Sequence, residues 1–150
     1  MARRSDAIAW RRRVLTAQSL YYVVTGLWPL VHLRSFELVT GPKTDDWLVH
    51  MVGLLAAVIG LVLGQAVVRD RLHTAEITLL AVAAAVAFAA IDLWYGLSGR
   101  ISAIYLADAA VQGGLLAALV WTRVTGPTPS DSQSFSASRE DRPPPSGPAV

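Results

Sequence analysis

The chain has 150 residues, enough for one domain, with 53% apolar and only 16% charged residues. Soluble domains carry about 25% charged residues, so this composition indicates a membrane protein. The absence of cysteine excludes disulfides and cysteine-ligated metal centres, and a net charge of +2 with no basic solvated face argues against nucleic-acid binding.

Four apolar segments are long enough to span a bilayer, because a spanning helix needs about 20 mostly apolar residues. The segments cover residues 14–33, 47–68, 75–97 and 101–121. Their short connectors make consecutive segments antiparallel. We therefore predict an all-α fold in which residues 1–123 form a transmembrane up-down four-helix bundle.

The first segment follows a cluster of arginines and carries Tyr21, Tyr22 and Trp28. Its apolar run is long and no small-residue cleavage motif follows it, so it is predicted to be a signal anchor rather than a cleaved signal peptide. Gln18 lies near the inner end of this segment, and we expect it to lie outside any polar pocket.

The stretch VTGPKTDDWLVH covers the end of the first connector and the start of the second segment. Thr44 is expected to cap the helix, with Asp45 and Asp46 in the first turn, where negative charge favours the helix dipole. Asp46 and His50 are four residues apart and share one helical face. A cation held by these two residues and Glu37 is the weaker alternative, and no metal site is predicted.

Small residues recur along the second segment at Ala56, Gly60 and Gly64. A face of this kind lets another helix approach closely. It predicts packing against a neighbouring helix of the same chain, with a homodimer through Gly60 and Gly64 as the alternative. Because the fourth segment contains Gly113 and Gly114, the second to fourth segments are expected to pack tightly.

Two carboxylates, Asp92 and Asp108, lie inside the third and fourth segments. A charge at the centre of a bilayer costs about 2.5 to 3.5 kcal/mol, so both side chains should face the bundle interior. We expect them to face each other and share one proton. Their role is open between hydrogen bonds that fix helix register and a site for a small molecule or proton. The residues of this predicted polar pocket, which opens outward, are Asp92, Asp108, Tyr105, Gln112, Tyr95 and His50.

Basic residues are distributed unequally between the two ends of the bundle. Ten of the 13 lysines and arginines fall on the side of the two termini. The positive-inside rule then predicts cytoplasmic N and C termini in a multi-pass protein of a bacterial inner membrane. Residues 124–150 are rich in serine, proline and charge, and are predicted to form a disordered cytoplasmic tail.

One long stretch carries a resemblance to a known family. QSLYYVVTGLWPLVHLRSFELVTGPKTDDWLVHMVG, followed later by IDLWYG and IYLADA, resembles a family of small uncharacterised bacterial four-span integral membrane proteins. The resemblance covers roughly residues 18–121. It implies the four-span architecture and no particular chemistry.

The predicted function is that of an integral inner-membrane protein, embedded in the lipid bilayer. It would bind a lipid or a small hydrophobic or amphipathic ligand, or serve as an accessory subunit. One alternative is a membrane-embedded enzyme that uses Asp92 and Asp108 as acid and base on a lipid-like substrate. Another is a proton-coupled transporter subunit. No nucleophile motif, metal motif or phosphate-binding loop is found, so a non-enzymatic role is favoured and no cofactor is predicted.

Overall fold

The computed structural model describes residues 2–124, and these residues form helices joined by short connectors. The predicted tail, residues 124–150, lies almost wholly outside the described part of the chain. Within residues 2–124 no strand occurs, so the all-helical prediction is confirmed. The helices are α1 (Ala2–Thr40), α2 (Asp46–Val68), α3 (Ala75–Leu97) and α4 (Ile104–Val124).

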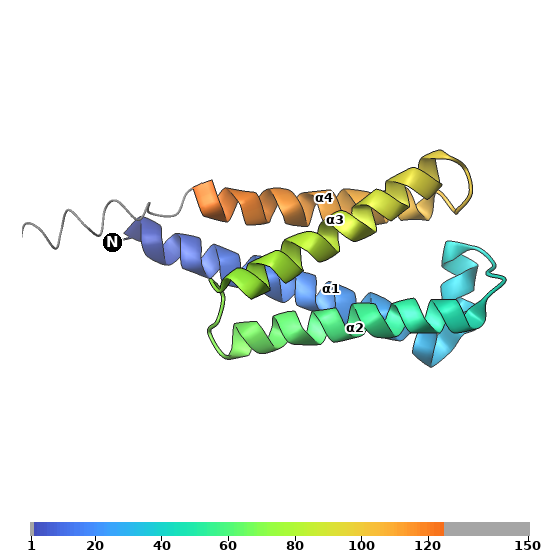
Figure 1. The fold of residues 1–150 in the computed structure, drawn as a ribbon, viewed down its shortest axis with the longest axis horizontal. Helices are drawn as coiled ribbons and strands as arrows, with labels where there is room; N and C mark the ends of the chain where they lie inside the picture. The colour runs from blue at the N-terminus through green and yellow to red at the C-terminus, as the bar shows by residue number, and fades with distance from the viewer. Residues whose placement is uncertain (1, 125–150) are drawn as a thin grey trace, which may run out of the picture.

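Consecutive helices run in opposite directions, and their long axes lie roughly along one direction (Figure 1). Each contains a stretch that is long and apolar enough to cross a membrane. α2 and α3 begin and end within one residue of the predicted segments. α4 begins at Ile104, three residues later than predicted, because residues 101–103 belong to the connector.

α1 is longer than the predicted first segment and is bent near its C-terminal end. The backbone of His32 leaves the helical region, with φ −151° and ψ 77°, three residues after Pro29. The Trp28 indole donates a hydrogen bond to Ser35 Oγ at 2.8 Å across this bend. The segment after the bend, residues 33–40, therefore turns back at the end of the bundle opposite the N-terminus (Figure 1). The apolar pattern of the sequence predicts a connector for most of these residues, so the extension of α1 is a difference from the prediction.

α1 and α2 form the closest helix pair, and glycines lie where their backbones meet. A methyl group built on Gly53 would lie 2.6 Å from the carbonyl oxygen of Gly26, and one built on Gly60 would lie 2.8 Å from that of Ser19. Ser19 also donates its hydroxyl hydrogen to Gly60 O at 2.7 Å. The small face of α2 thus contacts α1 within one chain, and the homodimer through Gly60 and Gly64 stays a prediction.

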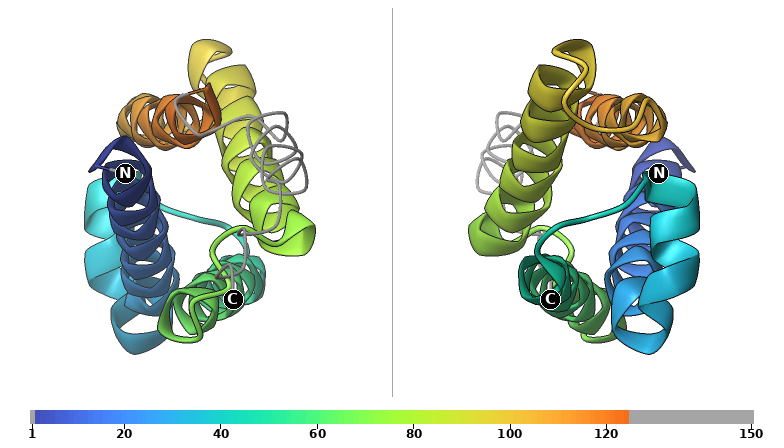
Figure 2. Two further views of the ribbon diagram at one scale, coloured as in Figure 1. Left: turned by 90° about the vertical axis from the view of Figure 1, so that its left-hand side faces the viewer. Right: turned by 90° about the vertical axis from the view of Figure 1, so that its right-hand side faces the viewer.

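The expected packing of the second to fourth helices within the chain is only partly right, because these three helices do not pack as one group. α3 packs mainly against α4, α1 also contacts α4, and α2 touches α3 only slightly. The end-on views show α2 separated from α4 by the other helices (Figure 2). A methyl group on Gly113 or Gly114 would meet no atom within 4 Å, so these glycines face outward instead of serving a close helix contact.

The start of α2 also differs from its prediction. Asp45, rather than Thr44, is the N-cap residue, and its side chain makes no capping hydrogen bond. The Asp45 carbonyl accepts the backbone N–H groups of Leu48 and Val49. Thr44 does not cap the helix because its hydroxyl turns toward the Asp45 carboxylate, 3.4 Å away. Asp46 lies in the first turn, as expected.

Candidate functional site: a central cavity with a buried carboxylate

A cavity of about 390 Å³ lies in the half of the bundle opposite the N-terminus, and all four helices contribute to its wall. The wall is mostly apolar, with aromatic side chains from α1 and α3. The Tyr22 and Phe88 rings meet edge to face with their centroids 5.3 Å apart. Ligand sites are typically concave and apolar, with a few polar groups that orient the ligand. The polar side chains in this wall are Tyr21, Tyr22, Thr25, Lys43, Asp92, Tyr105 and Gln112.

Asp92 is the most unusual residue of the wall. It is only 5% exposed, and its Oδ2 atom has no hydrogen-bond partner among the described residues. Its carboxyl group also interacts with the Asp108 side chain. A buried carboxylate oxygen without a donor is costly, since desolvation is not compensated by a hydrogen bond. Asp92 is therefore a residue of the cavity wall with one buried carboxylate oxygen that accepts no hydrogen bond from the described residues.

Asp108 is held in a different way. Its Oδ1 atom accepts hydrogen bonds from the Tyr21 hydroxyl and from Gln112 Nε2, the latter at 3.3 Å. Asp108 lines a second, smaller cavity of about 220 Å³ between α1 and α4, and Tyr21 and Tyr105 line both cavities. The two carboxylates thus lie in one polar region, but Asp108 Oδ1 accepts from two side chains, whereas Asp92 Oδ2 accepts from none of the described residues.

A chain of buried hydrogen bonds connects this region to the half of the bundle that is nearer the N-terminus. The Tyr22 hydroxyl donates to Gln112 Oε1 at 2.8 Å and accepts from Gln18 Nε2 at 3.3 Å. Gln18 Nε2 also donates to Ala81 O on α3 at 2.8 Å. These bonds join α1, α3 and α4. Gln18 is fully buried and lines neither cavity, and it joins the polar network through its hydrogen bond to Tyr22.

The outer rim of the cavity is formed by the bent end of α1 and the connector after it. Phe36 and Lys43 both line the cavity. The Lys43 ammonium lies 4.8 Å from the centroid of the Tyr105 ring and donates to Thr40 O at 3.1 Å. Its backbone N–H donates to Glu37 Oε1 at 3.1 Å. The bend at His32 therefore places the Lys43 ammonium and the Phe36 ring at this rim of the cavity.

Only some of the predicted pocket residues line a cavity. Asp92, Tyr105 and Gln112 line the central cavity, and Asp108 lines the adjoining one. His50 and Tyr95 line neither cavity. Tyr95 is 39% exposed and lies nearer the end of α3. The function of these residues as a site stays a prediction.

The contribution of α1 to the polar region was not predicted from the sequence. Tyr21 and Tyr22 were considered only as features of a membrane segment, yet they donate to Asp108 and Gln112. The available signal was helical spacing, since Gln18 precedes them by three and four residues and so lies on the same side of α1. That spacing predicts a polar face, but it does not reveal which helix the face meets.

The alternative cation site at Glu37, Asp46 and His50 is not assembled. Within residues 2–124, no three His, Asp or Glu side chains come close enough to hold a metal ion. Glu37 instead accepts the backbone N–H of Lys43.

Comparisons with known proteins add no further assignment. No protein-family model, no curated protein and no solved structure matches this chain. The resemblance to small bacterial four-span membrane proteins therefore stays a prediction.

Proposed function

We propose that this protein is a multi-pass protein of a bacterial inner membrane with both termini in the cytoplasm. Support comes from four helices that are long and apolar enough to span a bilayer. It also comes from the excess of basic residues on the side of the termini.

Reporter fusions test this topology. A periplasm-active reporter inserted at Lys43 is expected to be active, whereas the same reporter fused after Val124 is expected to be silent. A cytoplasm-active reporter should give the opposite pattern at the two positions. Cytoplasmic activity from the insertion at Lys43 would overturn the proposed orientation.

We further propose that the central cavity binds a small, largely apolar molecule that carries a hydrogen-bond donor. The observation that supports this most directly is that Asp92 belongs to the cavity wall and that its buried Oδ2 has no hydrogen-bond partner among the described residues. A ligand hydroxyl or amine would supply the missing donor after a rotation of the Asp92 side chain that turns Oδ2 toward the cavity. The cavity volume of about 390 Å³ falls within the range of about 300 to 1,000 Å³ seen for small-molecule sites.

Replacing Asp92 with leucine tests whether this residue serves a ligand or the fold. Leucine removes the uncompensated carboxylate and is close to it in size, so we expect the free energy of unfolding in detergent to rise by about 1 to 3 kcal/mol. Native mass spectrometry of the detergent-solubilised protein should at the same time show loss of a bound molecule that the wild type retains. Asp46→Asn, at the exposed start of α2, is the control and should retain that molecule.

A variant that loses stability and shows no change in bound mass would contradict the proposal. It would mean that Asp92 contributes hydrogen bonds to the bundle and binds no ligand. Gain of stability together with loss of the ligand is the pattern expected of a binding-site residue.

A second candidate function is that of an enzyme that uses Asp92 and Asp108 as acid and base. The different surroundings of the two carboxylates favour it. Asp108 is bonded by Tyr21 and Gln112, whereas Asp92 has a free acceptor, and such asymmetry suits opposite roles in proton transfer. Asp92→Asn keeps the shape of the side chain. If the protein is an enzyme, the Asp92→Asn variant should bind the substrate without converting it. The molecule that it retains should then differ in mass from the molecule retained by the wild type. A simple binding protein should retain the same molecule as the wild type.

A further inference from the structure

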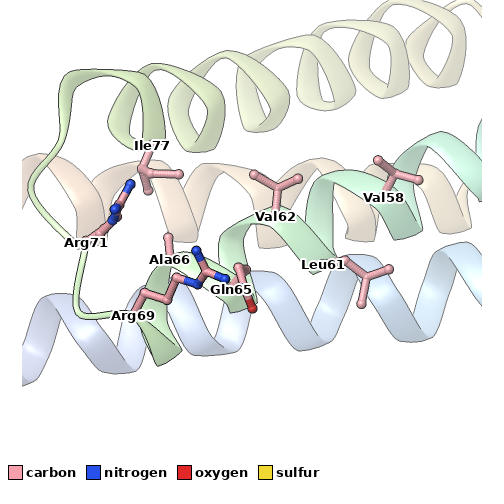
Figure 3. A pocket seen from close by; sticks show the side chains of 8 residues that line it. All are labelled: Val58, Leu61, Val62, Gln65, Ala66, Arg69, Arg71 and Ile77. Atoms are coloured by element: carbon pink, nitrogen blue, oxygen red, sulfur yellow. The ribbon is translucent and has the colours of Figure 1, made fainter.

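A groove of about 500 Å³ lies between the inner halves of α2 and α3, away from the central cavity. It exists because these two helices touch only slightly. Apolar side chains form its floor, and Gln65, Arg69 and Arg71 lie toward its inner end (Figure 3). The apolar residues that line it are Val58, Leu61, Val62, Ala66 and Ile77.

The two arginines at the inner end carry charge that the protein does not neutralise. The Arg69 guanidinium lies beside the Gln65 side chain, and the amide oxygen accepts from it at 2.8 and 3.1 Å when the amide is oriented to face it (Figure 3). Gln65 is neutral, so it orients Arg69 without cancelling its charge. The Arg71 side chain extends from the connector toward the start of α3 and has no hydrogen-bond or ion-pair partner within residues 2–124 (Figure 3).

The acidic residue nearest to Arg69 and Arg71 in the sequence does not neutralise their charges. Asp70, which lies between the two arginines, forms an ion pair with Arg12 of α1. Its backbone has a positive φ of 55°, which belongs to the tight turn after α2. The turn thus separates Asp70 from its two neighbours and leaves both guanidinium groups available to an anion.

The length of the groove fits a lipid chain. Val58 lies eleven residues before Arg69 on α2, which corresponds to about 16 Å along the helix axis. This is close to half of the roughly 30 Å hydrocarbon thickness of a bilayer, the depth of one leaflet. Arginine binds phosphate oxygens through paired N–H groups, and basic pockets between helices on the cytoplasmic side suit anionic headgroups.

We propose that this groove binds an anionic phospholipid, with its phosphate at Arg69 and Arg71 and one acyl chain along Val58, Val62 and Ile77. The inference rests on the proposed membrane placement, and it is independent of any ligand in the central cavity. The site would fix a lipid between α2 and α3, where the protein itself provides little helix contact.

The test uses native mass spectrometry of the full chain in detergent, titrated with phosphatidylglycerol or phosphatidylcholine. We expect the wild type to bind phosphatidylglycerol more tightly. The double variant Arg69→Gln/Arg71→Gln should weaken phosphatidylglycerol binding by about 30-fold, since each basic residue near an anionic lipid contributes about 1 kcal/mol, a factor of about five. Arg34→Gln/Arg100→Gln removes the same charge at the other end of the bundle and should leave the affinity unchanged.

Val62→Trp tests the acyl-chain contact without altering charge. Val62 is already 42% exposed, so tryptophan is expected to fill the groove and leave the fold intact. Its phosphatidylglycerol affinity should fall at least fivefold, and excess inorganic phosphate should not displace the lipid from the wild type.

Equal binding of both lipids, or equal losses in the two double variants, would overturn the proposal. Displacement by inorganic phosphate, with no effect of Val62→Trp, would also overturn it and assign a free-phosphate site to the arginines. The molecule retained through Asp92 should stay bound in Arg69→Gln/Arg71→Gln, so failure of the lipid site and failure of the central-cavity site give different results.

Discussion

Replacing Gly26 with alanine is expected to lower the free energy of unfolding by about 3 kcal/mol, the upper end of the range for overpacking. The added methyl group would lie 2.6 Å from the backbone nitrogen of Ala57 and 3.2 Å from the Ala56 side chain, and it would also collide with Gly53 O. Backbone atoms cannot move aside as a flexible side chain can, so α1 and α2 would have to separate. Unfolding of the purified protein in detergent measures the change.

Gly113→Ala is the matched control for this prediction. Gly113 lies in α4, and a methyl group there would meet no atom within 4 Å. Alanine favours a helix over glycine by up to about 1 kcal/mol, so the variant should be as stable as the wild type or slightly more stable. Similar losses in both variants would mean that the α1–α2 contact is not specific, which contradicts the packing described above.

Replacing Arg11 with methionine is expected to cost about 3 kcal/mol of unfolding free energy, through lost charge-assisted hydrogen bonds. Arg11 is only 3% exposed. Its guanidinium donates to Leu72 O at 2.7 Å and to Thr78 Oγ1 at 2.6 Å. These bonds attach the inner connector and the first turns of α3 to α1. Methionine keeps the length of the side chain but leaves the buried Leu72 carbonyl without this donor. Thermal unfolding in detergent measures the loss.

Arg13→Met provides the comparison, because Arg13 is an exposed arginine on the same helix. It should change stability by less than about 0.5 kcal/mol, as surface substitutions usually do. Full stability of both Arg11→Met and Arg13→Met would contradict the prediction. It would mean that Arg11 affects only the orientation of the protein in the membrane.

The helices were more predictable from the sequence than the contacts between them. α2 and α3 are apolar runs bounded by polar connectors, so their length and composition sufficed to locate them. The bend in α1 was not predicted from hydropathy, although Pro29 inside the apolar run is a residue type that bends helices. The Trp28–Ser35 hydrogen bond spans the break at His32. That bond depends on how the chain turns, which hydropathy does not encode.

The candidate site was predictable only in part, for a related reason. The cost of placing a carboxylate in hydrocarbon pointed to Asp92 and Asp108 as interior groups. Their partners could not be identified in the same way, since the Tyr21–Asp108 bond joins residues 87 positions apart. Helical periodicity shows which residues share a face, and the neighbour of that face depends on the packing of the whole bundle.

Photocrosslinking from the cavity wall tests the proposed binding function most directly. Phe88→p-benzoylphenylalanine places the reactive group in the central cavity, and Leu79→p-benzoylphenylalanine places it on a 69% exposed position of the same helix. After irradiation in cells and purification, mass spectrometry should show one dominant adduct at position 88, absent when Asp92→Leu is also present. Position 79 should give a mixture of phospholipid adducts. The same phospholipid mixture at both positions, unaffected by Asp92→Leu, would contradict the proposal that the cavity holds a specific ligand.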